Sequence, residues 1–139
     1  MPKNILVVDD NASIRYLIRS LLESTGYTVC GEAEDGTNAI EKAKQLKPDL
    51  ICLDLSMPRM NGAEAASVLK RLMPAVPIIL FTMHEDNVGK HLARAVGVDK
   101  VLGKPDGMSR LTESIAELLN RTSRPSVASG TVLPRAPSP

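Results

Sequence analysis

Residues 53–62 read Leu-Asp-Leu-Ser-Met-Pro-Arg-Met-Asn-Gly, and this stretch contains the most informative residue of the chain. Its acid, Asp54, ends an apolar run and precedes a turn that contains proline and glycine. Such a residue is expected at the carboxyl edge of a strand, which is where open α/β sheets bind ligands. A second apolar run, residues 5–8, is followed by Asp9 and Asp10. If the two strands are neighbours, three carboxylates converge at one edge.

Five short aliphatic or β-branched runs alternate with five helical patterns along the chain. This order predicts βαβ units with right-handed crossovers, and therefore a doubly wound α/β fold with helices on both faces of a parallel sheet. The predicted strands span residues 4–8, 28–33, 50–53, 78–82 and 100–103. The predicted helices run from residue 14 to Gly26 and over residues 36–45, 62–72, 87–95 and 109–121. The fourth helix is the weakest, because Gly89 interrupts a short apolar stripe.

Composition favours one folded domain followed by a tail. The chain has 139 residues, of which 43% are hydrophobic, and this is enough material for a two-sided core. We expect residues 1–121 to form the domain. Residues 122–139 are rich in proline, serine and arginine, which predicts a disordered tail or linker.

Charge and targeting signals limit the cellular location and the classes of partner that we expect for the chain. Residues 1–120 carry 14 Lys and Arg against 16 Asp and Glu, unlike the basic patch of a typical nucleic-acid-binding domain. No run approaches the roughly 20 apolar residues of a membrane-spanning helix, and the start lacks a signal peptide. Cys30 and Cys52 lie in strand-like runs without metal-ligand spacing, which predicts buried, reduced thiols. We therefore expect a cytoplasmic protein without direct nucleic-acid or membrane binding.

Polar residues follow four of the predicted strands at what would be one edge of the sheet. These residues are Asp9, Asp10, Asp54, Thr82 and Lys104. Taken singly, each has an ordinary role as a helix cap, a turn residue, a strand former or a solvated lysine. Taken together, three close carboxylates repel one another and require a hard cation, for which Mg²⁺ is the best fit. Thr82 and Lys104 suit the oxygens of a phosphoryl group, and Asp54 is then the predicted nucleophile, which forms an acyl phosphate.

The same residues carry a family resemblance. Asp9-Asp10, Asp54 with Met57-Pro58 and Gly62, Thr82, and Lys104-Pro105 resemble the receiver domain of two-component response regulators, of the kind found in chemotaxis regulators. The resemblance covers about residues 3–121 and is specific, because five separated motifs occur in the right order. It implies a flavodoxin-like (βα)5 sandwich with strand order 2-1-3-4-5, an order taken from the family and not from the residues.

The resemblance also implies the roles of individual residues. Asp54 is the implied phosphoacceptor, Thr82 the switch hydroxyl and Lys104 the phosphate partner. The implied Mg²⁺ ligands are Asp9, Asp10, Asp54 and the backbone carbonyl of Ser56. The bond between Lys104 and Pro105 is expected to be cis by the same analogy.

Partners follow from the resemblance as well. A histidine kinase or a histidine phosphotransfer protein is the expected phosphoryl donor in a phosphorelay, docking near the first helix. A downstream protein is expected to read the face made by the fourth helix, the fifth strand and the fifth helix. A homodimer on phosphorylation is left open. The chain is not expected to be an enzyme beyond its own phosphorylation and dephosphorylation.

Two positions depart from the family pattern, and they leave alternatives open. Val101 stands where the family often has a rotating aromatic residue, and Met83 where a small residue is usual; His84 lies next to it. A receiver-like interaction module that works without phosphorylation is the main alternative, supported by Val101. A dehalogenase-type enzyme would need Asp-x-Asp where the chain has Ser56. A flavodoxin is also disfavoured, because Asp9 and Asp10 would repel an uncomplexed phosphate.

Overall fold

Five parallel strands form the centre of the molecule. The structure is a computed structural model that describes residues 3–55, 57, 60–82, 91 and 95–123. The strands are β1 Asn4–Val8, β2 Thr28–Ala33, β3 Leu50–Asp54, β4 Ile78–Thr82 and β5 Lys100–Gly103. They lie in the order β2-β1-β3-β4-β5. The predicted strands and strand order are confirmed, and β3 is one residue longer than predicted because it includes Asp54.

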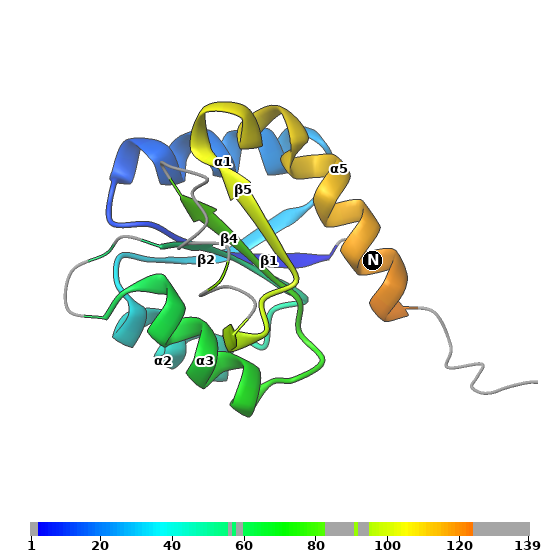
Figure 1. The fold of residues 1–139 in the computed structure, drawn as a ribbon. Coiled ribbons are helices and arrows are strands. Elements are labelled where there is room, and N and C mark those ends of the chain that lie inside the picture. Colours follow the sequence, from blue (N-terminus) through cyan, green and yellow to red (C-terminus); the bar gives the residue numbers. More distant parts are fainter. Residues whose placement is uncertain (1–2, 56, 58–59, 83–90, 92–94, 124–139) are drawn as a thin grey trace, which may run out of the picture.

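Helices cover both faces of this sheet. They are α1 Ala12–Ser24, α2 Gly36–Leu46, α3 Gly62–Leu72 and α5 Lys104–Ser123. Helices α1 and α5 lie on one face, and α2 and α3 lie on the opposite face (Figure 1). The predicted doubly wound α/β fold is confirmed by this three-layer arrangement.

The register of the central strands aligns their carboxyl ends. Val8 of β1 lies opposite Leu53 of β3, and Leu53 lies opposite Leu80 of β4. Every residue of β3 is buried, as expected for a central strand of a parallel sheet that is covered on both sides. The chain turns to opposite sides of the sheet after β1 and β3, so the crevice between their carboxyl ends is the topological switch point.

Asparagine and aspartate side chains start the first three helices. The side chain of Asn11 accepts hydrogen bonds from the backbone N–H groups of Ser13 and Ile14. Asp35 caps α2 in the same way, and Asn61 forms a reciprocal capping box at the start of α3. These bonds satisfy N–H groups that have no partner within a helix. Because Asn11 is the cap of α1, Asp10 does not have the capping role that its sequence position also allowed.

The last helix differs from its prediction. It begins at Lys104 and not at Ser109. Pro105 lies in its first turn, where the missing N–H is not needed for a helical hydrogen bond. Among the peptide bonds whose two residues are fully described, none is cis. The side chains of Lys104 and Pro105 lie outside what the structure describes, so the expected cis bond between them stays a prediction.

Some predictions fall on residues that the structure does not describe. These are Ser56, Met83, His84, most of the predicted helix at residues 87–95, and residues 124–139 of the predicted tail. Among the described residues, no helix is both long enough and apolar enough to cross a membrane. Neither cysteine forms a disulfide; Cys52 is buried as predicted, whereas Cys30 is only partly buried.

Candidate phosphoacceptor and metal site

Three carboxylates meet at the switch point of the sheet. Asp9 and Asp10 follow β1, and Asp54 ends β3. Each of the three offers an oxygen, and these oxygens all lie within 4.8 Å of one another. Asp9 and Asp54 are 1% and 3% exposed, whereas Asp10 is exposed. The structure therefore brings together all three acids that the sequence singled out, in a half-buried cluster open to solvent on the side of Asp10.

Asp9 is held by the backbone on both sides of the site. Its N–H donates to the carbonyl of Ala33 at the end of β2, over 3.0 Å. Its carboxylate oxygen Oδ1 accepts from the N–H of Asn11, over 2.9 Å. Asn11 thus has two tasks, because its side chain caps α1 while its own N–H orients Asp9. These bonds keep a buried carboxylate in one place at the mouth of the site.

Asp54 is held through the residues that follow it. The N–H of Leu55 donates to the carbonyl of Phe81 in β4, and the N–H of Gly62 donates to the carbonyl of Leu55, both over 2.8 Å. A Cβ atom at Gly62 would lie 2.2 Å from the carbonyl oxygen of Asp54. Only glycine fits there without a shift of the backbone. The glycine of the sequence motif is therefore explained by its close approach to Asp54.

The structure places the backbones of Thr82 and Lys104 at the same edge. Thr82 ends β4 and lies opposite Gly103 of β5, and Lys104 follows directly as the first residue of α5. Their side chains lie outside what the structure describes, as does the whole of Ser56. The positions of these two backbones agree with the predicted edge, and the roles of the three residues stay predictions.

Val101 occupies an ordinary core position. It lies opposite Leu80 in the β4–β5 register and packs, partly buried, against the apolar cluster under α2 and α3. An aliphatic side chain of this size has no ring to rotate between an inward and an outward position. Any switch in this chain must therefore work without an aromatic rotamer at this position.

Sequence reasoning missed one functional neighbour of the acidic cluster. Arg15 of α1 donates a hydrogen bond from Nη1 to the backbone carbonyl of Asp9, over 2.6 Å. The sequence only places Arg15 on the polar side of an amphipathic helix. Its second partner, Glu32, is 17 residues further along the chain, so no local pattern could have indicated the contact.

Comparisons with known proteins agree with this geometry. Residues 5–116 match the family described as the response regulator receiver domain. The chain is 35% identical over 115 residues to the chemotaxis protein CheY of Thermotoga maritima, covering 83% of this chain and 96% of that protein. It is 36% identical to the alkaline phosphatase synthesis transcriptional regulatory protein PhoP of Bacillus subtilis, covering 88% of this chain but only 50% of that protein. The response regulator domain of Thermotoga maritima CheB has a TM-score of 0.80 with 30% identity, covering 86% of this chain and 98% of that one.

Fold and site together define a doubly wound α/β protein with an acidic cluster at its switch point. The chain belongs to the response regulator receiver domain family. It is a receiver of a two-component signalling system, homologous to CheY and PhoP, and such domains are signalling modules.

Proposed function

We propose that Asp54 is the phosphoacceptor of this receiver. A carboxylate oxygen of Asp54 attacks the phosphorus of a phosphohistidine, and an acyl phosphate forms as the bond from phosphorus to the imidazole nitrogen breaks. The leaving nitrogen keeps the electron pair of that bond. The observation that supports this role is the meeting of Asp54 with Asp9 and Asp10, with oxygens within 4.8 Å of one another.

The donor set fits Mg²⁺. Three carboxylates supply hard oxygen ligands, and the exposure of Asp10 leaves room for the waters that Mg²⁺ retains. Asp9, Asp10 and Asp54 would hold the ion, with the backbone carbonyl of Ser56 as a fourth ligand by analogy with the family. When bound, Mg²⁺ supplies positive charge that offsets the repulsion between carboxylates and phosphoryl oxygens. The buried Asp9 keeps its ligand oxygen oriented through the N–H of Asn11.

Thr82 and Lys104 complete the proposed site. We assign to the Thr82 hydroxyl and the Lys104 ammonium the remaining phosphoryl oxygens, because both backbones lie at the edge where Asp54 ends. Their engagement would change the face made by the helix predicted at residues 87–95, β5 and α5, which a downstream partner or a second receiver would read. Autophosphorylation and dephosphorylation would be the only reactions that the chain catalyses.

The donor is a histidine kinase or a histidine phosphotransfer protein. Helix α1 supports this assignment, because it starts beside the acidic cluster and leaves two large side chains in solvent. Tyr16 is 68% exposed and Leu17 is 52% exposed. A donor that covers them would bring its phosphohistidine to the mouth of the site. We place this receiver in the cytoplasm, and residues 122–139, of which the first two still belong to α5, would serve as a tail or linker.

Intact-mass analysis after incubation with acetyl phosphate tests the proposal. We expect one phosphoryl adduct that requires Mg²⁺ and is lost in Asp54→Asn. Asp49→Asn is the matched control, because Asp49 precedes the same strand at its opposite end, where it accepts a bond from the N–H of Asn4. This control should keep the adduct. An adduct that persists in Asp54→Asn would show that another residue is the acceptor.

Absence of any adduct in the wild-type protein calls for a second probe. Beryllium fluoride with Mg²⁺ mimics the acyl phosphate without a phosphoryl donor, so it reports on the site alone. Beryllium fluoride binding that is lost in Asp54→Asn would support the proposal. The missing adduct would then mean that the receiver accepts a phosphoryl group from its kinase and not from acetyl phosphate. Failure to bind would favour the interaction module that works without phosphorylation.

A further inference from the structure

Arg15 links the acidic cluster to the neighbouring strand. Its Nη1 donates to the backbone carbonyl of Asp9 over 2.6 Å, and its Nε donates to Oε1 of Glu32 over 3.0 Å. Arg15 is only 17% exposed and Glu32 is 27% exposed, so both bonds are partly shielded from water. One guanidinium group on α1 therefore joins the end of β1 to the edge strand β2.

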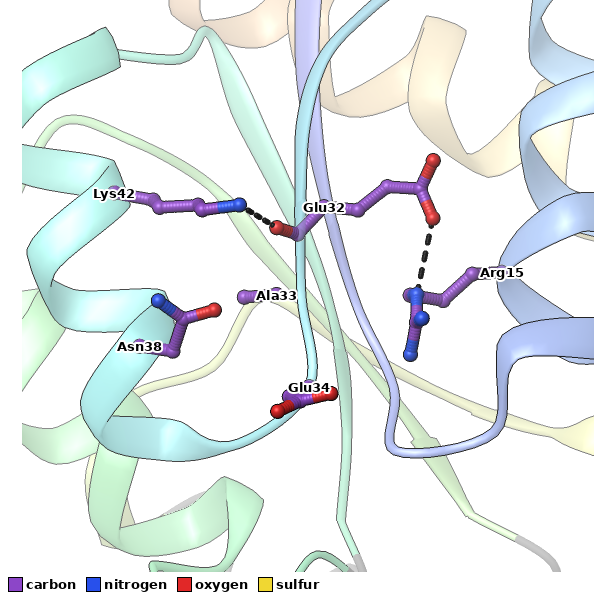
Figure 2. Close-up of a pocket in the computed structure, with 6 residues that line it drawn as sticks. All are labelled: Arg15, Glu32, Ala33, Glu34, Asn38 and Lys42. Atoms are coloured by element: carbon purple, nitrogen blue, oxygen red, sulfur yellow. Dashed lines mark hydrogen bonds and ion pairs between the residues drawn. The ribbon is translucent and has the colours of Figure 1, made fainter.

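Glu32 is itself fixed from several directions. Arg19, one turn further along α1, donates to its second carboxylate oxygen. Lys42 of α2 donates to its backbone carbonyl. Figure 2 shows Arg15 and Lys42 approaching Glu32 from opposite sides of an open pocket of about 350 Å³. Arg15 is thus anchored to a residue that cannot easily move.

The contact with Asp9 matters because of the peptide in which it lies. The carbonyl of Asp9 belongs to the bond between Asp9 and Asp10. Its direction fixes the plane of that peptide, and with it the path along which Asp10 leaves β1. Asp9 is already held by Ala33 and Asn11, whereas Asp10 is exposed. The bond from Arg15 therefore acts on the peptide that leads from the first acid to the second.

We propose that Arg15 is a positioning residue for the metal site, acting through the peptide that joins Asp9 to Asp10. The inference rests on the proposed function, since it concerns the same cluster. Residues that orient metal ligands typically change metal affinity by about 10–100-fold when they are replaced. The charge of Arg15 acts in the opposite direction, because a cation near the cluster weakens metal binding. If Arg15 positions the ligands, replacing it weakens metal binding. If only its charge matters, removing that charge strengthens metal binding.

Arg15→Lys separates the two effects. Lysine keeps the charge, but its single ammonium lacks the planar fork that reaches two acceptors in fixed directions. We expect Mn²⁺, measured by the loss of the spin-resonance signal of the free ion, to bind about tenfold more weakly to Arg15→Lys. Competition with Mg²⁺ should give the same ratio. In the metal-free protein, the carbonyl carbon resonance of Asp9 and the amide nitrogen resonance of Asp10 should both shift.

Arg19→Lys is the matched control. Arg19 shares Glu32 with Arg15 and lies on the same helix, but its bonds go to Glu32, Glu23 and the carbonyl of Val29 and not to Asp9. This variant should bind Mn²⁺ as the wild type does. Glu32→Gln is a second test in case Arg15→Lys fails to fold, and it should weaken Mn²⁺ binding in the same direction by a smaller factor.

The outcomes distinguish the inference from the proposed function. Equal Mn²⁺ affinity of wild type and Arg15→Lys, or tighter binding by Arg15→Gln, would overturn the positioning role and leave the phosphoacceptor proposal intact. Failure of the wild-type protein to bind Mn²⁺ or Mg²⁺ would overturn the metal site itself, and with it both proposals. Retention of the phosphoryl adduct by Arg15→Lys at saturating Mg²⁺, with loss only at low Mg²⁺, would support the inference.

Discussion

Helices α1 and α5 meet the sheet through large aliphatic side chains, whereas α2 and α3 meet it mainly through alanine and glycine. The buried side chains of α1 are Ile18 and Leu22, and α5 adds Leu111, Ile115, Leu118 and Leu119. On the opposite face, α2 buries Gly36, Ala39 and Ala43, and α3 buries Gly62, Ala63, Ala65, Ala66 and Leu69. The bulk on that second face comes instead from the strands, through residues such as Leu6, Leu53 and Leu80.

This difference in side-chain size explains how closely the backbone approaches Asp54. Small residues let the start of α3 approach the end of β3 so closely that a Cβ at Gly62 would lie 2.2 Å from the carbonyl oxygen of Asp54. At Gly36, which opens α2, a Cβ would lie 2.8 Å from Met60 in the turn before α3. Asp54 is thus positioned by close backbone contacts on the alanine face. The aliphatic face supplies apolar burial and, through Arg15 on α1, a polar bond to Asp9.

The aliphatic face should be most sensitive to loss of volume. Leu22→Ala removes a fully buried side chain from α1, and such a change costs about 2–5 kcal/mol in the free energy of unfolding because it leaves a cavity. Leu17→Ala is the matched control, since Leu17 lies on the same helix but is 52% exposed. Urea titrations of the two variants measure the difference. Similar losses for both would mean that α1 is not packed as described.

The alanine face should instead be sensitive to added volume. Ala66 is fully buried in α3, so Ala66→Leu must push the helix away from the sheet, at a cost of about 1–3 kcal/mol. Because α3 also carries Gly62, we expect this variant to lose acetyl phosphate labelling of Asp54 beyond what its lower stability explains. Arg71→Leu, at an exposed position of the same helix, should leave labelling unchanged. If the folded Ala66→Leu variant is labelled as well as the wild type, the packing of α3 does not affect the phosphoacceptor site.

Much of this architecture follows from the sequence, because it depends on local patterns. The alternation of apolar runs with amphipathic helices predicts the strands and the layers. Acids at the ends of β1 and β3 predict the cluster, since parallel strands expose their carboxyl ends at one edge. The helix cap at Asn11 was available from the same patterns.

The rest could not be predicted because it depends on contacts between distant segments. Arg15 meets Glu32 only after β2 has paired with β1, and the close approach of Gly62 to Asp54 depends on how α3 docks. Helix α5 also begins at Lys104, before the predicted start at Ser109, and Gly107, a residue of low helix propensity, lies between the two positions. In the structure a Cβ at Gly107 would lie 2.9 Å from Leu102 and from Phe81. Packing therefore requires a glycine where propensity alone indicates a loop.

The two cysteines lie on opposite faces of the sheet and differ in burial, so we expect them to differ in reactivity. Cys52 points into the aliphatic core and is 1% exposed, and burial raises its pKa from 9.0 to about 12. Cys30 packs against the alanine face and is partly buried; burial, opposed by a backbone hydrogen bond, raises its pKa as well. Because the thiolate is the reactive form, a thiol reagent should modify Cys30 first in the native protein and reach Cys52 only on unfolding.

The raised pKa of Cys52 also predicts a dependence of stability on pH. The unfolded chain loses the thiol proton near 9.0, while the folded protein retains it to about 12. Stability from this group is therefore complete below pH 9.0 and falls as the pH rises toward 12, because the unfolded state then binds fewer protons. Unfolding of Cys52→Ala should show a shallower decline over this range than the wild type, whereas Cys30→Ala should follow the wild type more closely. Parallel declines for all three proteins would mean that Cys52 ionises as easily in the folded protein as in the unfolded chain, and hence that the aliphatic core admits water.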